Sequence, residues 1–130
     1  MKQNEKQELV KYRVYKAKET IQEIEILIEN KLWNTAVNRL YYACYYAVSA
    51  LLAQKDINAQ THAGVRQMFG LHFIKTELIS KDLGKFYSEI FDKRLTGDYD
   101  DFIDYSEKDI IELYGPAKKL ILTIDSLLKN

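Results

Sequence analysis

Apolar residues recur along this chain with the period of an α-helix. In the first such segment, from about Glu5 to Asn30, they fall on one face and charged residues occupy the other. The apolar face contains Leu9, Tyr12, Ala17, Ile21, Ile24 and Ile28, and the charged face contains Lys11, Lys18, Glu19, Glu23 and Glu29. This pattern predicts an amphipathic helix at the surface of a bundle.

The segment from about Leu32 to Gln54 is apolar on more than one face. Its main stripe contains Trp33, Val37, Leu40, Tyr41, Cys44, Val48, Leu51 and Leu52. Tyr42 and Tyr46 form a second stripe about 100° around the helix. A helix of this kind is central in a bundle or lies at a contact between subunits. Its longest apolar run, residues 40–53, is shorter than the roughly 18 residues that a membrane span requires.

Two further helices are expected after turn residues at 55–60. Thr61 is placed to cap a helix from about His62 to Ser80. Its expected buried residues are Val65, Met68, Phe69, Phe73, Ile74 and Leu78. A shorter helix from Lys81 to about Leu95 should stop at Thr96 and Gly97, because glycine tolerates the left-handed conformation of a helix end.

The last helix is expected from Ser106 to about Leu128. Ser106 and Asp109 are spaced as in a capping box. Pro116 lies inside this segment, so we expect a kink or a break there. No segment alternates as a strand does. The sequence therefore predicts a single all-α domain over residues 1–130, an up-and-down antiparallel bundle of about five helices.

Charge and cysteine content narrow the class of protein. Nineteen basic residues balance nineteen acidic ones, so a nucleic acid would have to bind at a local positive patch. Cys44 is the only cysteine, which is typical of a reducing compartment. The first residues contain no apolar stretch after their lysines, unlike a signal peptide. These features favour a soluble cytoplasmic protein without a membrane partner.

The residue pattern predicts no metal site and no cofactor. Neither His62 nor His72 follows a glutamate by three positions, which is the spacing in di-iron bundles. The aspartates at positions 98, 100, 101 and 104 lack the spacing of a calcium-binding loop. Glycine-rich phosphate loops are absent as well.

Tyrosine is frequent, with ten residues in this short chain. The pairs Tyr41/Tyr45 and Tyr42/Tyr46 lie one turn apart on the second helix. They either pack in the core with hydrogen-bonded hydroxyls or present rings on which nucleic-acid bases stack. Arg39 lies on the Tyr42/Tyr46 side and would supply positive charge, unless it forms an ion pair on the helix surface.

Three features in order make a specific resemblance to a known family. They are the tyrosine-rich helix Arg39–Leu52, the "THAGV" turn at 61–65 followed by Phe69, and the arginine-plus-"DY" element Arg94–Tyr99. Over residues 10–128 the chain resembles small bacterial and archaeal proteins of the HEPN superfamily (higher eukaryotes and prokaryotes nucleotide-binding). The resemblance implies a helical bundle that is usually a homodimer. It also implies a module like a toxin–antitoxin pair, in which a minimal nucleotidyltransferase is the partner.

The resemblance also implies candidate site residues. Many HEPN proteins are metal-independent ribonucleases in which an arginine holds the phosphate and a following histidine moves a proton. Arg94 matches the arginine, but positions 98–101 read Asp-Tyr-Asp-Asp and no histidine follows His72. Asp98, Tyr99 or His62 would have to replace the histidine. Alternatively, Arg94 only forms an ion pair with Asp98.

One further role, covalent modification of a tyrosine, follows from the resemblance. In some related modules the nucleotidyltransferase modifies a tyrosine just after the arginine motif, which matches Tyr99 first and Tyr105 second; the alternative is a tyrosine packed across the turn. The candidate residues for binding nucleotide or RNA are Arg39, Tyr42, Tyr46 and Arg66.

Three functions are therefore compatible with the sequence. The favoured one is a HEPN protein that binds a nucleotidyltransferase, a nucleotide or RNA without catalysis of its own. The second is a metal-independent ribonuclease toxin that uses Arg94 with an unusual proton-transfer residue. The third is a structural adaptor that only dimerises.

Overall fold

The computed structural model describes residues 2–99 and 103–129, and the described part is helical without strands. The elements are α1 (Gln3–Glu29), α2 (Trp33–Gln54), α3 (His62–Phe69), the π-helical turn η1 (Gly70–Ile74), α4 (Lys81–Tyr99) and α5 (Glu107–Leu128). The predicted all-α bundle is confirmed. Two aspartates of the acidic turn, Asp100 and Asp101, lie outside the described residues.

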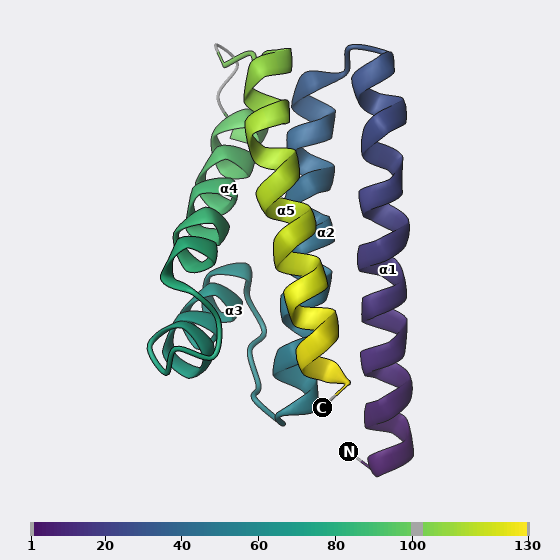
Figure 1. Ribbon diagram of the computed structural model, residues 1–130, viewed down its shortest axis with the longest axis vertical. Coiled ribbons are helices and arrows are strands. Elements are labelled where there is room, and N and C mark those ends of the chain that lie inside the picture. Colours follow the sequence, from purple (N-terminus) through teal and green to yellow (C-terminus); the bar gives the residue numbers. More distant parts are fainter. Residues whose placement is uncertain (1, 100–102, 130) are drawn as a thin grey trace.

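Helix α2 is the centre of the bundle. Figure 1 shows α1, α2 and α5 side by side along the long axis, with α4 next to α5 and α3 near the lower end. α2 packs against α1, α3, α4 and α5. Its predicted main stripe is buried, including Val37, Leu40 and Tyr41, except that Trp33 is only partly buried. Every side chain of the site described below therefore contacts this helix or lies next to it.

Helix α1 buries a narrower face than its pattern predicts. Ala17, Thr20 and Ile24 are fully buried against the bundle. The pattern predicts Tyr12 on the same face, but its side chain is 59% exposed. The reason is geometric, because Tyr12 precedes Ala17 by five residues and so points about 140° away from it around the helix.

Helix α3, which Thr61 caps, is shorter than predicted. The Thr61 side chain does cap it, because its hydroxyl accepts a hydrogen bond of 2.9 Å from the backbone N–H of Gly64. The chain then leaves helical geometry after Ile74 and turns at Glu77, whose φ is 65°. Leu78 is consequently 57% exposed, contrary to prediction, and Ile79 is buried in its place.

Helix α4 continues past its predicted end. It runs to Tyr99, and Gly97 has no positive φ, so Thr96 and Gly97 do not stop it. Gly97 instead allows a close approach, because a Cβ atom there would lie 2.9 Å from Cε2 of Tyr105. The Tyr105 hydroxyl donates to the Lys93 carbonyl at 2.6 Å and so holds Tyr105 against α4.

Helix α5 begins as predicted. The Ser106 hydroxyl accepts from the backbone N–H of Asp109, and the Asp109 carboxylate accepts from that of Ser106. This hydrogen bond from the Ser106 backbone lowers the pKa of Asp109. The helix passes through Pro116 without a break, so that alternative was wrong. No described helix is long and apolar enough to span a membrane.

Candidate functional site

Side chains from α2, α3 and α4 meet around Tyr41. We call this group the Arg94–His62 cluster. It consists of Asn38, Tyr41, Tyr42 and Tyr45 of α2, His62 of α3, and Arg94 and Asp98 of α4. The four α2 residues share one helix face because they are spaced by three and four positions. The cluster therefore joins segments more than fifty residues apart in the sequence.

The orientation of His62 is fixed by three tyrosines. Nδ1 of His62 lies 2.7 Å from the Tyr41 hydroxyl. The imidazole stacks on Tyr45, with ring centroids 4.3 Å apart, and meets Tyr42 edge-on at 5.7 Å. Burial, together with the charge of Arg94, lowers the pKa of His62. The imidazole is therefore mostly neutral at pH 7 and can accept a proton.

Tyr41 remains protonated at any physiological pH. Its side chain is fully buried, and burial raises its pKa to about 12. A protonated phenol can donate its hydrogen bond to Nδ1 of His62. That arrangement places the ring proton of neutral His62 on Nε2.

Arg94 is a buried cation packed on aromatic rings. It is only 8% exposed, and its Cζ lies 4.7 Å from the ring centroid of Tyr41 and 5.9 Å from that of Tyr42. Nη1 lies 3.6 Å from Oδ2 of Asp98, which is longer than a good hydrogen bond. Nε has no hydrogen-bond partner in the part of the chain that the structure describes. The guanidinium thus retains donor capacity beyond its pair with Asp98.

Asp98 lies at the open side of the cluster. Asn38 donates from Nδ2 to both carboxylate oxygens at 3.3 Å, and the Asp98 side chain is 35% exposed. Sequence reasoning missed Asn38, although its spacing of three and four residues before Tyr41 and Tyr42 was a usable signal. Together, Asn38 and Arg94 fix the carboxylate at the end of α4.

The two candidate tyrosines for modification differ in accessibility. Tyr99 is 80% exposed, so it is not packed across the turn. The hydroxyl of Tyr105 is engaged with the Lys93 carbonyl, and its ring packs over Gly97. Of these two tyrosines, only Tyr99 has an accessible hydroxyl.

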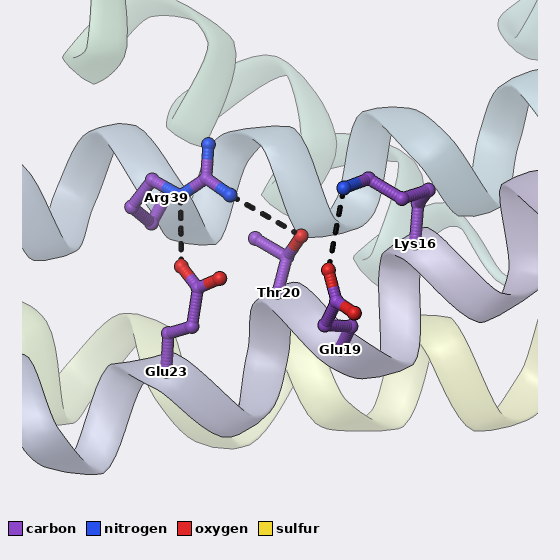
Figure 2. Close-up of polar contacts among 5 residues, drawn as sticks. All are labelled: Lys16, Glu19, Thr20, Glu23 and Arg39. Carbon is purple, nitrogen blue, oxygen red and sulfur yellow. Dashed lines mark hydrogen bonds and ion pairs between the residues drawn. The ribbon is translucent and has the colours of Figure 1, made fainter.

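The structure does not bring all predicted binding residues into the cluster. Nε of Arg39 binds Glu23 at 3.1 Å and Nη2 donates to Thr20 at 3.4 Å, both on α1 (Figure 2). Lys16 and Glu19 form a neighbouring pair at 3.3 Å in the same view. Arg39 therefore has the ion pair that the sequence offered as its alternative role.

Tyr46 and Arg66 lie near the cluster but outside it. The ring centroid of Tyr46 is 6.3 Å from that of Tyr42. Arg66 packs over Phe91 at 4.3 Å and pairs with Asp92 at 3.5 Å, near Arg94 in the sequence of α4. Within the described residues, no group of three or more metal-ligating side chains is placed to hold an ion.

The architecture and the cluster define a small helical-bundle protein with one buried arginine beside a histidine. The family model for the HEPN domain matches residues 10–127, so the chain belongs to the HEPN family. A "UPF0332 protein" of Thermotoga maritima is 35% identical over 127 residues, covering 98% of this chain and 96% of its own.

Two archaeal relatives carry more specific names. "Putative toxin MJ0142" of Methanocaldococcus jannaschii is 36% identical over 80% of this chain and 70% of its own. "Putative toxin MJ0605" of the same organism is 40% identical over 64% of this chain and 62% of its own. The family is thus established.

Proposed function

We propose that this chain is a toxin-like HEPN protein that binds single-stranded RNA or a nucleotide through the Arg94–His62 cluster, without cleaving it. The observation that carries the proposal is the state of Arg94, a buried cation on two tyrosine rings with Nε unpaired among the described residues. Arginine holds phosphate through several donors at once, and tyrosine rings stack with bases. The names of the two archaeal relatives support the toxin-like role.

A phosphate would reach Arg94 from the side of Asp98. The 3.6 Å separation from Asp98 leaves room for a better acceptor on the guanidinium. Tyr42 and Tyr46 are half-buried and would receive the adjoining bases. Arg39 and Arg66 would contact the RNA only on release of their ion pairs with Glu23 and Asp92. No histidine follows Arg94 where the resemblance leads us to expect one, and the negative charge of Asp98 opposes phosphate rather than assisting chemistry. This is why we favour binding over cleavage.

A second candidate function is metal-independent RNA cleavage. The observation that favours it is that His62 and Arg94 both contact Tyr41. A neutral, oriented histidine can take a proton from a 2′-hydroxyl, and a nearby arginine can stabilise the charge that develops on the phosphate. His62 would then replace the histidine missing from the motif after Arg94.

The proposed function also includes two protein partners. We propose a homodimer and a small nucleotidyltransferase as the partner in the module. The 80% exposure of Tyr99 supports its availability for modification by such an enzyme. A folded dimer that binds neither RNA nor nucleotide nor a transferase would instead be a structural adaptor.

The test is RNA binding by the purified protein in EDTA. Fluorescence anisotropy of a short labelled single-stranded RNA is compared for wild type, Arg94→Gln and Lys119→Gln. Lys119 is an exposed lysine of α5 outside the cluster, so its variant controls for loss of one charge. We expect about tenfold weaker binding for Arg94→Gln, equivalent to one lost charged contact. Equal affinity of Arg94→Gln and wild type, with both folded by circular dichroism, would refute the proposal.

The same samples distinguish the second candidate. After incubation, the RNA is separated on a denaturing gel. Cleavage by wild type that is lost in both Arg94→Gln and His62→Gln would establish a ribonuclease. Intact RNA that nevertheless binds supports the non-catalytic function.

A further inference from the structure

A cavity adjoins the Arg94–His62 cluster on the side of Tyr45. It has a volume of about 490 Å³, which is in the range of small-molecule sites. It is lined by residues of the first half of α1, the second half of α2, the segment that connects α2 to α3, and Val65 of α3. Its polar lining residues are Arg13, Tyr45, Ser49, Asp56 and Asn58.

Arg13 provides an available cation in this cavity. Its Nη1 donates to the backbone carbonyl of Ser49 at 3.1 Å, which holds the side chain between α1 and α2. No carboxylate within the described ranges lies at ion-pair distance from it. Asp56, at the rim, is paired with Lys6 at 3.2 Å. Since one carbonyl uses only one of its five N–H donors, Arg13 can still bind an anion.

Ser49 has an unsatisfied hydroxyl. The residue is 6% exposed, and its Oγ has no hydrogen-bond partner among the residues that the structure describes. A buried serine hydroxyl on a helix commonly bonds the carbonyl four residues earlier, but this one does not. This oxygen is shielded from solvent, so Ser49 contributes to the cavity through its backbone carbonyl, which accepts the hydrogen bond from Arg13.

The cavity and the cluster share Tyr45. One side of its ring carries the stacked imidazole of His62 at 4.3 Å, and the residue also lines the cavity. Along α2, Tyr41 and Ser49 are eight residues apart, which corresponds to about 12 Å. Arg94 contacts Tyr41 and Arg13 contacts Ser49, so the two arginines lie at different levels along α2.

We infer that this cavity binds one nucleotide. The phosphate lies against Arg13, while the Asn58 amide bonds the polar edge of the sugar or base. The base lies against the apolar wall that Leu52 and Val65 provide. In one respect the inference rests on the proposed function, because we assign this nucleotide to the same RNA strand that contacts Arg94.

Free nucleotides test the cavity independently of RNA. The backbone amide signals of ¹⁵N-labelled protein are followed while each of the four nucleoside 5′-monophosphates is added. We expect saturable shifts at Tyr45, Ser49 and Asn58 for at least one of them. Arg13→Gln should weaken this binding by about tenfold, the effect of one charged contact. Lys119→Gln should leave it unchanged.

A second variant guards against misfolding of the Arg13 variant. Ala53→Leu keeps every charge but adds side-chain volume at the cavity wall. It should abolish the shifts while the protein remains folded. The same titration is then repeated with inorganic phosphate in place of the nucleotides. If phosphate produces the same shifts with the same affinity, the cavity binds simple anions and the nucleotide assignment is overturned.

RNA binding then separates this inference from the proposed function. If Arg94→Gln weakens RNA binding but no nucleotide shifts the Tyr45 and Ser49 signals, the cavity inference is wrong and the proposed function stands. If nucleotides bind at the cavity but wild type binds no RNA, the cavity is a site for free nucleotides and the RNA assignment is wrong. Weaker RNA binding by both Arg13→Gln and Ala53→Leu supports the inference in full.

Discussion

The Tyr41 hydroxyl lies 2.7 Å from Nδ1 of His62, and the guanidinium of Arg94 packs on the ring of the same tyrosine at 4.7 Å. One buried side chain in the middle of α2 therefore positions both the histidine and the arginine. The sequence separates these residues widely, and only the packing of α3 and α4 on α2 brings them together.

Tyr41→Phe should destabilise the protein. It removes the hydroxyl that pairs with His62 and leaves Nδ1 without that partner, which should cost roughly 1 kcal/mol of unfolding free energy. Urea unfolding at neutral pH measures it. Tyr45→Phe is the matched control, because no hydrogen bond of the Tyr45 hydroxyl occurs among the described residues. Equal losses in the two variants would contradict the role of the Tyr41–His62 contact.

Arg94→Gln should raise the pKa of His62. The positive charge of Arg94 is one of two causes that lower this pKa, and burial is the larger one. Removing the charge makes protonation of the imidazole easier, so the pKa should move toward the ordinary value of 6.5 without reaching it. NMR titration of the imidazole Cε1–H signal reports this directly, with His72→Gln used for assignment. A pKa that stays constant or falls would mean that Arg94 and His62 are not electrostatic neighbours.

Gly97→Ala should destabilise the end of α4. The added methyl group would meet the Tyr105 ring at 2.9 Å, and that ring cannot withdraw without breaking its hydrogen bond to the Lys93 carbonyl. Gly70→Ala is the matched control, since a Cβ atom at Gly70 would meet no other residue within 4 Å. Alanine in a helix is favoured over glycine by about 0.5–1 kcal/mol, so the control should be stabilised. Thermal unfolding should therefore move in opposite directions, and a stabilised Gly97→Ala would disprove this packing role.

Asp98→Asn tests whether Asp98 opposes RNA binding or acts as the base of a ribonuclease. The change removes the negative charge 3.6 Å from Nη1 of Arg94 while keeping the shape of the side chain. If Arg94 only binds phosphate, RNA affinity should rise several-fold because the competing carboxylate is gone. Were Asp98 the base of a ribonuclease, RNA cleavage should fall sharply instead. Anisotropy and a denaturing gel on the same samples show which result occurs.

The helices follow from local sequence signals, whereas their ends often do not. The caps at Thr61 and Ser106 and the stripe of α2 are determined within a few residues, so the pattern predicts them correctly. The role of Gly97 depends on Tyr105, which reaches it only after the chain has turned. For Leu78 the helical period predicts burial, but the period does not hold past Glu77 and its positive φ.

In the candidate site, contacts within one helix could be predicted from the sequence, whereas contacts between helices could not. The Arg94–Asp98 pair lies within one helix, so its spacing indicates it. The contacts of Tyr41 with His62 and of Asn38 with Asp98 join separate helices, and no periodicity encodes them. For Arg39, the surface ion pair depends on Glu23 of the neighbouring helix. The sequence could name the chemically capable residues but could not pair them.

The salt dependence of RNA binding tests the central claim most directly. Each phosphate that a cationic side chain neutralises on single-stranded RNA contributes about 0.7 to the slope of log affinity against log salt concentration. If Arg94 contacts a phosphate, Arg94→Gln should bind more weakly and its slope should be shallower by about that amount, with Lys119→Gln matching wild type. An Arg94→Gln protein whose affinity and slope both equal those of wild type would contradict the account.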